Sequence, residues 1–364
     1  MTVEKLLDLA PGKNNPRNSE GAFLALKDGR IAFLYSRYVG GSSDDNAYSE
    51  IAVIFYDGKG FTEPRILAHP DAEKGEINNM SVSALRLPDW DAAVFYLIKY
   101  DGVSSEYVMR RSKDELETLE EPTVCVSPDY KGYYVVNNDR VVLLGDGRLM
   151  AAAADHPSTM GFRGVKDRMD GRGKAIFYAS EDAGRTWKQL SEAISLPGGA
   201  HSGSGLQEPG LLELPNGTLY AYFRTDLGRQ YESFSADGGV SWSIPQPSAF
   251  TSPCSPLLIK RNPYSGKFIA VWNPTPESPC RYLFGEPKPK IWTGGRTPLV
   301  MAESEDGLHF GEPQVIECDP RAGFCYPAMF FTGGKEMLLA YCAGGVEESD
   351  ASCLVRLRIS RVSW

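Results

Sequence analysis

Short apolar segments alternate with polar turns along the whole chain. The segments are four to six residues long, and they include Ile31–Tyr35, Ile51–Tyr56, Ala93–Ile98, Val141–Leu144, Leu219–Phe223, Phe268–Trp272 and Met337–Tyr341. Several follow a turn dipeptide such as Asp146-Gly147 or Asn216-Gly217. No stretch of about 10–15 residues has the periodicity and caps of an amphipathic helix. The pattern therefore predicts an all-β protein.

One turn motif recurs at a regular interval. The motif Ser-x-Asp-x-Gly-x-Thr/Ser-Trp occurs intact around Asp182 and Asp237, and weaker copies surround Asp57, Asp114 and Asp306. Successive Asp residues lie 55 to 69 positions apart, which is near the length of a four-stranded sheet with its loops. In such a turn we expect the Asp to accept backbone hydrogen bonds, the Gly to take a positive φ and the aromatic residue to anchor the hairpin.

The repeats predict the architecture. Five marked sheets and a last one, formed by residues 327–343 and 352–364, make six. Radial repetition of such sheets gives a six-bladed β-propeller with four-stranded antiparallel blades, which occupies residues 1–364 as a single domain. A pair of β-sandwiches is the alternative, but sandwiches do not repeat an Asp turn at this period.

Charge and hydropathy narrow the choice of partners. The chain has 38 Lys and Arg against 47 Asp and Glu, a net charge of −9, which argues against nucleic acid or an anionic membrane surface as partner. The longest apolar runs have seven residues, far fewer than the roughly 18 that span a bilayer. With no apolar core of signal-peptide length at the N-terminus, we expect a cytoplasmic chain, although a secreted chain whose leader had been removed would look the same.

Cysteine and histidine spacing gives no support for a cofactor. The seven cysteines form no C-x-x-C pair, and their odd number indicates reduced thiols. The four histidines never occur in an H-x-H or H-x-x-x-H spacing. We therefore expect no metal site and no organic cofactor.

The repeated turns and their aromatic residues resemble the sialidase superfamily, whose six-bladed propellers carry Asp-box repeats. The resemblance covers nearly the whole chain. Because such repeats also occur in non-catalytic propellers, the catalytic positions have to be compared one by one.

The first blade is similar to that of exo-sialidases in the order of its residues. The family has an Arg, a strand that ends in a second Arg, and then a loop with Ser-Asp; here these positions match Arg17, Arg37 and the pair Asp44-Asp45. The family's Arg-Ile-Pro is Arg-Asn-Ser in this chain. Either Arg17 or Arg37 could therefore bind a carboxylate, and either Asp44 or Asp45 could be the loop acid.

Three later segments carry the rest of the resemblance. Gln207-Glu208 and, one hairpin later, Arg224 resemble the segment with the family's active-site Glu and second Arg. Arg296 is similar to the third Arg of the triad. Tyr326 resembles the tyrosine nucleophile, although the family usually has Tyr-Ser where this chain has Tyr-Pro.

These residue types suit the hydrolysis of an acidic sugar. Three guanidinium groups can bind a substrate carboxylate with bidentate geometry. A neutral phenol is not repelled by that carboxylate, and a Tyr nucleophile is known among glycosidases. Because free Tyr has a pKa near 10, we expect Glu208 to take its proton and the loop Asp to act as acid and then base. The resemblance thus implies a retaining exo-glycosidase.

Further polar residues are candidates for contacts with the sugar. They precede or follow predicted strands, or lie in the Gly-rich segment before Glu208: Asn79, Asn138, Arg140, His156, His201 and Gln207. The expected partner is an acidic sugar or oligosaccharide. Two alternatives stay open: a lyase or glycosidase for glycans with uronic acids, and a non-catalytic glycan-binding propeller. The sequence does not indicate the oligomeric state.

Overall fold

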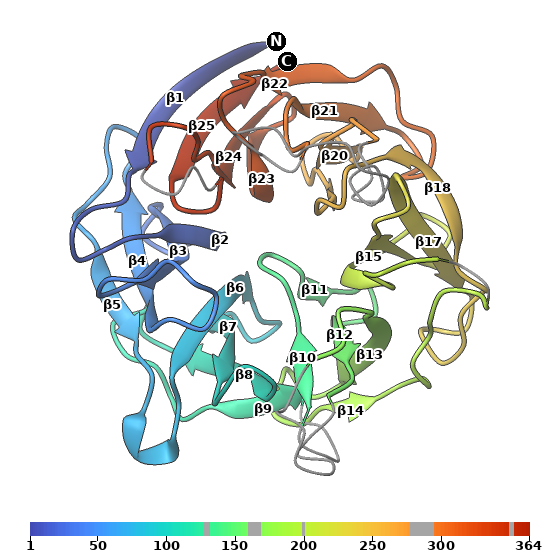
Figure 1. The fold of residues 1–364 in the computed structure, drawn as a ribbon, viewed down its shortest axis with the longest axis horizontal. Helices are drawn as coiled ribbons and strands as arrows, with labels where there is room; N and C mark the ends of the chain where they lie inside the picture. The colour runs from blue at the N-terminus through green and yellow to red at the C-terminus, as the bar shows by residue number, and fades with distance from the viewer. Residues whose placement is uncertain (127–131, 159–168, 199–200, 277–294, 349–352) are drawn as a thin grey trace.

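Six antiparallel sheets surround a central axis in the computed structural model (Figure 1). The structure describes residues 1–126, 132–158, 169–198, 201–276, 295–348 and 353–364. The predicted six-bladed β-propeller is confirmed, and the one regular helix in these ranges is a short 3₁₀ turn, Ala72–Lys74. Within the described ranges, no helix has the length and apolar character needed to cross a membrane.

Each blade is a meander whose first strand lies nearest the axis (Figure 1). Blades 1 and 2 contain β2 (Asn18–Ala25), β3 (Ile31–Tyr38), β4 (Ser49–Tyr56), β5 (Arg65–Ala68), β6 (Asn78–Arg86), β7 (Ala92–Lys99), β8 (Ser105–Ser112) and β9 (Thr123–Val126). Blades 3 and 4 contain β10 (Tyr133–Val135), β11 (Val142–Leu143), β12 (Leu149–His156), β13 (Lys174–Ser180), β14 (Lys188–Gln189), β15 (Gln207–Glu213), β16 (Leu219–Arg224), β17 (Arg229–Ser235) and β18 (Gln246–Thr251). Blades 5 and 6 contain β19 (Leu258–Arg261), β20 (Phe268–Trp272), β21 (Leu299–Ser304), β22 (Gln314–Glu317), β23 (Cys325–Gly333), β24 (Glu336–Cys342), β25 (Leu357–Ser363) and β1 (Thr2–Leu9).

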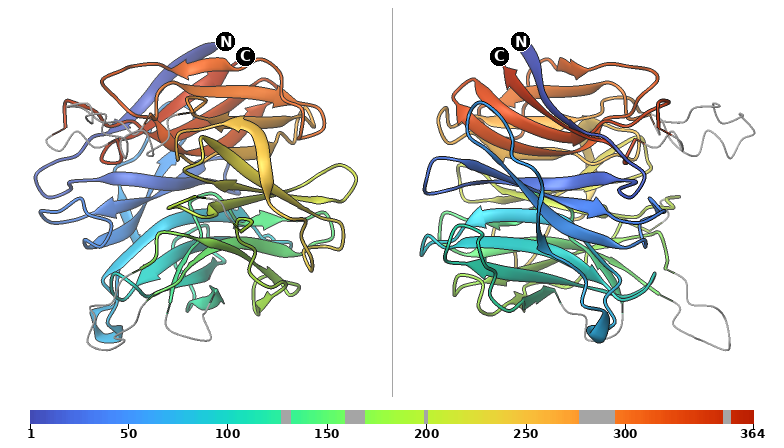
Figure 2. Two further views of the ribbon diagram at one scale, coloured as in Figure 1. Left: turned by 45° about the vertical axis from the view of Figure 1, so that its right-hand side comes forward. Right: turned by 90° about the vertical axis from the view of Figure 1, so that its left-hand side faces the viewer.

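The two ends of the chain close the ring. Strand β1 pairs antiparallel with β25, from Thr2 opposite Ser363 to Leu9 opposite Leu357. The termini therefore lie side by side in every view (Figures 1 and 2). This pairing fills the outer position of blade 6, so the two ends of the chain together complete one blade and close the ring.

The core lies between neighbouring blades. Strand β7 is buried along its whole length, and Val94 and Tyr96 from it pack with Ile51 and Val53 of blade 1. Because both faces of each sheet are covered by the adjacent blades, the middle strands are nearly continuous apolar runs rather than alternating ones. This explains the apolar segments seen in the sequence.

The repeated Asp turns connect the third and fourth strands of the blades. In the turn of blade 3, Asp182 accepts hydrogen bonds from the backbone N and the hydroxyl of Thr186, at 2.9 and 2.6 Å. Gly184 has φ +86°, as expected for this position. Trp187 then packs edge-on against Phe95 of blade 2, with ring centres 6.1 Å apart. The turn thus fixes a hairpin and places an aromatic ring against the preceding blade.

A second repeated feature lies at the axis. Five non-glycine residues of the inner-strand regions have φ values between +46° and +60°, and all are polar: Glu20, Ser81, Asp139, Glu208 and Tyr326. Four of them coincide with a shift of register in strands β2, β6, β15 and β23. A bulge of this kind re-aims a side chain. Because the inner strands run in the same direction, these bulges lie near one face of the ring, opposite to the Asp turns.

Candidate active site

The centre of the site is a contact between Tyr326 and Glu208, which come from blades 6 and 4. The Tyr326 hydroxyl donates a hydrogen bond of 2.7 Å to Glu208 Oε1. Both residues occupy bulges with positive φ, and the backbone therefore holds both side chains toward the axis. Among the described residues, the buried second oxygen of Glu208 has no hydrogen-bond partner.

Burial keeps the Tyr326 phenol protonated in the free protein. Desolvation is the largest effect, and the charge of Glu208 adds to it, so that the pKa of Tyr326 lies well above its usual value. The positive charges of Arg224 and Arg296 act in the opposite direction. A phenol in this state needs a base to become a nucleophile, and Glu208 already accepts its hydrogen bond.

Arg224 contacts both members of this pair. It ends strand β16, and its Nη1 donates to Glu208 Oε1 and, at 3.3 Å, to the Tyr326 hydroxyl. Its Nε lies 3.2 Å from Cys254 Sγ. Because residue 207 pairs with residue 224 across the β15–β16 hairpin, the hairpin brings Glu208 and Arg224 to the same end of blade 4.

Arg296 approaches the same phenol from blade 5. Its guanidinium carbon lies 5.5 Å from the centre of the Tyr326 ring. Its Nη1 lies 3.3 Å from Cys325 Sγ and 3.6 Å from Cys353 Sγ. No carboxylate of the described residues forms an ion pair with Arg296, so its charge faces the two thiols and the Tyr326 ring.

Arg17 is the third arginine, and it differs from the other two in its surroundings. Its side chain is only 2% exposed, and its guanidinium lies 4.5 Å from the centre of the Tyr38 ring. It pairs with Asp45 at 2.5 Å and with Glu20 at 3.2 Å. Its Nε also donates to Ser19 Oγ at 3.0 Å.

The other arginine of blade 1 points elsewhere. Arg37 is the second-last residue of β3 and forms an ion pair of 2.5 Å with Glu50 on the neighbouring strand. The charges of Arg17, Lys99 and Arg296, by contrast, act on Asp45. Of the two candidates for carboxylate binding in blade 1, the structure thus brings Arg17 and not Arg37 to the other arginines.

The loop between β3 and β4 carries the two candidate acids. Asp44 accepts a hydrogen bond from the backbone N of Asn46 at 2.9 Å and so closes its own turn. Asp45 instead faces Arg17, with its side chain 62% exposed. Its backbone oxygen accepts hydrogen bonds from Lys99 Nζ at 2.8 Å and Asn78 Nδ2 at 3.3 Å. The loop is therefore anchored to blade 2 at the residue that faces the arginines.

The charges around Asp45 keep it ionised in the free protein. Partial desolvation alone would raise its pKa, but the positive charge of Arg17 outweighs this effect and lowers the pKa below the usual value. Lys99 and Arg296 act in the same direction. Occupation of the arginines by an anionic ligand would remove this influence, so that the Asp45 pKa would rise when such a ligand binds.

Two buried charged residues of the site were missed by sequence reasoning. Glu20 is 3% exposed and accepts hydrogen bonds from Arg17 and, at 2.7 Å, from Ser81 Oγ. Burial raises its pKa, and Arg17 opposes this rise. Lys99 is 1% exposed, and burial lowers its pKa. The sequence does contain a signal for both residues, because each is a charged residue directly next to an apolar strand segment. Glu20 lies near the start of β2, and Lys99 is the last residue of β7.

The candidates for sugar contacts are more dispersed. Asn138 and Arg140 belong to the framework: Asn138 Nδ2 donates to the backbone oxygens of Gly21 and Pro327 at 3.0 and 3.3 Å, and Arg140 Nη1 donates to the Tyr222 hydroxyl at 2.7 Å. Gln207 Nε2 donates to the Gly171 backbone oxygen at 2.7 Å. These side chains therefore have partners within the protein that a sugar would have to replace.

The remaining three candidates differ in their surroundings. Asn79 is buried, and its side-chain oxygen has no partner among the described residues. The His156 Nδ1 lies 3.1 Å from the Asp170 backbone oxygen, and burial lowers the pKa of His156 even though Glu208 opposes the shift. His201 is exposed. In the described part of the chain, no group of three or more His, Cys, Asp or Glu side chains could hold a metal ion.

Comparison with known families agrees with this geometry. Residues 17–337 match a family described as the BNR repeat-like domain. The chain belongs to this family. The match covers blades 1 to 5 and the inner strand of blade 6, including the bulges and the Asp turns. No curated protein matches this BNR repeat-like chain.

Solved structures share its fold at low sequence identity. A protein of unknown function from Dyadobacter fermentans has a TM-score of 0.71 and 15% identity, with 99% of each chain covered. The leech intramolecular trans-sialidase, complexed with 2,7-anhydro-Neu5Ac, has a TM-score of 0.69 and 13% identity over all of this chain and 70% of its own. The intramolecular trans-sialidase from Ruminococcus gnavus has a TM-score of 0.68 and 12% identity, with 99% and 97% covered. The resemblance of this BNR repeat-like chain to the sialidase superfamily is thus confirmed for the fold.

Proposed function

We propose that the protein is an exo-glycosidase of sialidase type, which hydrolyses a terminal acidic sugar with retention of configuration. The observation that carries the proposal is the hydrogen bond from Tyr326 to Glu208, with Arg224 in contact with both groups. A protein that only binds glycans has no need of a buried phenol paired with a carboxylate beside three arginines.

The arginines are suited to hold the carboxylate of the substrate. Arg296 has no ion pair with a described residue, and Arg224 lies on the other side of the same phenol. Arg17 completes the triad once the substrate competes with Asp45 for its guanidinium. Planar guanidinium groups bind carboxylates in a bidentate manner and keep their charge at any working pH.

The proposed reaction proceeds in two steps. When the substrate carboxylate occupies the arginines, Asp45 takes up a proton from solvent. In the first step, Tyr326 Oη attacks the anomeric carbon and passes its proton to Glu208, while the bond to the leaving oxygen breaks and Asp45 donates its proton to that oxygen. In the second, Asp45 takes a proton from water, the water oxygen attacks the anomeric carbon, and the bond to Tyr326 breaks. Glu208 then returns the proton to the phenolate, and Asp45 releases its proton to solvent as the product leaves, which restores the free enzyme.

The direct test is hydrolysis of 4-methylumbelliferyl N-acetylneuraminate, with the matching glucuronide as a second substrate. We expect release of the fluorophore from the first compound, and a loss of at least ~10³-fold in kcat for Tyr326→Phe. Tyr264→Phe, at an exposed position, is the matched control and should be as active as the wild type. Absence of hydrolysis, or full activity of Tyr326→Phe, would contradict the proposal, and an unsaturated product from a uronic-acid glycan would favour the lyase alternative.

A further inference from the structure

Lys99 is a buried cation that takes no part in the proposed reaction. It is the last residue of β7 and is 1% exposed. Its Nζ donates to the Asp45 backbone oxygen at 2.8 Å and to Asn46 Oδ1 at 3.5 Å, and it lies 5.2 Å from the centre of the Tyr133 ring. The two hydrogen bonds connect the end of blade 2 to the loop between β3 and β4.

Asn78 provides a second connection from the same end of blade 2. It is the first residue of β6 and pairs with Lys99 across the β6–β7 hairpin. Its Nδ2 donates to the backbone oxygens of Asp45 and Ala47, at 3.3 and 2.6 Å. Because both donor residues are buried, water competes little for these hydrogen bonds. Blade 2 thus holds the loop backbone at residues 45 and 47.

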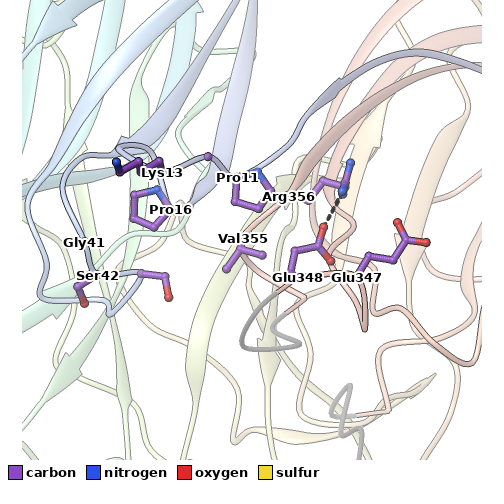
Figure 3. Close-up of a pocket in the computed structure, with 11 residues that line it drawn as sticks. Pro11, Lys13, Pro16, Gly41, Ser42, Glu347, Glu348, Val355 and Arg356 are labelled. Carbon is purple, nitrogen blue, oxygen red and sulfur yellow. Dashed lines mark hydrogen bonds and ion pairs between the residues drawn. The ribbon is translucent and has the colours of Figure 1, made fainter.

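On the side of blade 6, the same loop borders a cleft. The cleft has a volume of about 690 Å³, and residues 41–43 of the loop line it together with Glu347, Glu348 and Arg356. Figure 3 shows Ser42 on one side of the cleft and Glu347 and Arg356 on the other. The loop therefore faces open space toward blade 6, whereas residues 45–47 are bonded to blade 2.

The side chain of Asp45 differs from its backbone in this respect. It is 62% exposed and pairs with Arg17, and the proposed acid has to leave this partner to reach the oxygen of the bond that is cleaved. A fixed backbone limits where the carboxyl group can lie while the exposed side chain changes partners. This matters because a displacement of about 1 Å at a catalytic group can lower the rate about 100-fold.

We infer that Lys99 and Asn78 are positioning residues for the proposed acid: they hold the backbone of Asp45 where its side chain reaches the leaving oxygen. The inference rests on the proposed function. An ammonium group suits this role because it donates up to three hydrogen bonds. Burial lowers the pKa of Lys99, and the charges of Asp45 and Glu20 oppose this shift. Loss of either donor should impair proton donation without affecting the nucleophile and its base.

The test separates proton donation from the other steps by the choice of leaving group. In a series of aryl N-acetylneuraminides from 4-nitrophenyl to 4-methoxyphenyl, the leaving oxygen becomes more basic and depends more strongly on an acid. The value of kcat/KM includes the step in which this bond breaks. We expect Lys99→Met to lower kcat/KM about 10–50-fold for the 4-methoxyphenyl glycoside and less than about three-fold for the 4-nitrophenyl glycoside. Asn78→Ala should give the same trend with a smaller loss, and it tests the inference if Lys99→Met does not fold.

Two further variants calibrate the series. Asp45→Asn keeps the backbone oxygen that accepts from Lys99 but removes the acid, so it should show the same trend with a larger loss. Lys59→Met, at an exposed position in the β4–β5 turn, is the matched control and should leave kcat/KM unchanged for every glycoside.

The failures can be told apart. A wild type that hydrolyses none of the aryl glycosides would overturn the proposed function itself. Equal losses on all glycosides in Asp45→Asn would overturn the assignment of the acid. An active wild type whose folded variants at Lys99 and Asn78 lose the same factor on every glycoside, or lose none, would overturn the positioning role.

Discussion

Two features repeat around the ring, and they differ in what is repeated. The Asp turns on one face repeat their side chains: Ser180 and Ser235 both donate to the Asp two positions later, at 2.8 Å. The inner-strand bulges near the other face repeat only their backbone conformation. Their side chains vary: Glu20 and Glu208 in blades 1 and 4, Ser81 in blade 2, Asp139 in blade 3 and Tyr326 in blade 6.

The difference indicates that the Asp turns stabilise the fold, whereas the bulges position residues for the proposed reaction. A turn with the same side chains in several blades does the same structural task in each, and it lies away from the axis. The bulges of blades 4 and 6 instead bring the proposed base, Glu208, and the proposed nucleophile, Tyr326, to one point. The cost of a left-handed backbone at non-glycine residues is typical of functional sites. We therefore expect substitutions at the bulges to affect activity and substitutions at the turns to affect stability.

The largest effect is expected at the bulge of blade 4. Glu208→Gln keeps the shape of the side chain but removes the base that faces the Tyr326 hydroxyl, so kcat should fall by about 10²–10⁴-fold. Steady-state kinetics with the aryl substrate measures this fall. Glu312→Gln, at an exposed position, is the control. A Glu208→Gln variant with more than a tenth of the wild-type kcat would contradict the assignment of activity to the bulges.

A smaller effect on activity is expected at the bulge of blade 1. In Glu20→Gln, an amide takes the place of the carboxylate that holds Arg17 and Ser81, and one charged hydrogen bond is lost. We expect kcat/KM to fall by roughly 10–100-fold, mainly through a higher KM, because Arg17 is assigned to substrate binding. An unchanged KM together with a lower melting temperature would instead give Glu20 a purely structural role.

The Asp turn of blade 3 should respond in the opposite way. Asp182→Ala removes the acceptor for the Thr186 backbone and hydroxyl, much as the loss of a helix cap does, and should lower the free energy of unfolding by about 0.5–2 kcal/mol. Urea denaturation measures this change. The kcat of the folded variant should stay within about two-fold of the wild type, and a large loss would mean that the turns also shape the site.

The smallest effect concerns acid stability. Hydrogen bonds from Thr186 and Ser180 outweigh desolvation and lower the pKa of Asp182 to about 2, from a usual 3.8. A lowered pKa in the folded state means that the stabilisation is complete above about pH 4 and disappears as the pH falls through about 2. The difference in urea midpoint between wild type and Asp182→Asn should therefore be larger at pH 5 than at pH 2.5. A difference independent of pH would exclude this contribution.

The same contrast explains what could be predicted from the sequence. The Asp turns could be recognised in the sequence because the same residue types recur. Their spacing was sufficient to predict the six blades. The pairing of β1 with β25 could not be predicted in this way, since it joins Thr2 to Ser363 across the whole chain and no turn motif marks it.

The site could be predicted only in part. Tyr326, Glu208, Arg224 and Arg296 were found through the resemblance of single segments, and the structure brings them together. The choice between Arg17 and Arg37 needed the structure. The sequence does not show that Arg37 pairs with Glu50 on the next strand, whereas Arg17 pairs with Asp45. Arg140 was proposed as a sugar contact because it precedes a strand, but it donates to the Tyr222 hydroxyl inside the framework. Glu20 was missed since no repeated residue type marks a bulge.

The central claim is that Tyr326 forms a covalent bond with the sugar, and trapping with 2,3-difluoro-N-acetylneuraminic acid tests it most directly. The fluorine at the ring carbon next to the anomeric centre slows hydrolysis of the intermediate, so that intact-protein and peptide mass spectrometry can detect it. We predict one added sugar on the peptide that contains Tyr326 and none in Tyr326→Phe. An active wild type that carries no adduct, or carries it on another residue, would contradict the account.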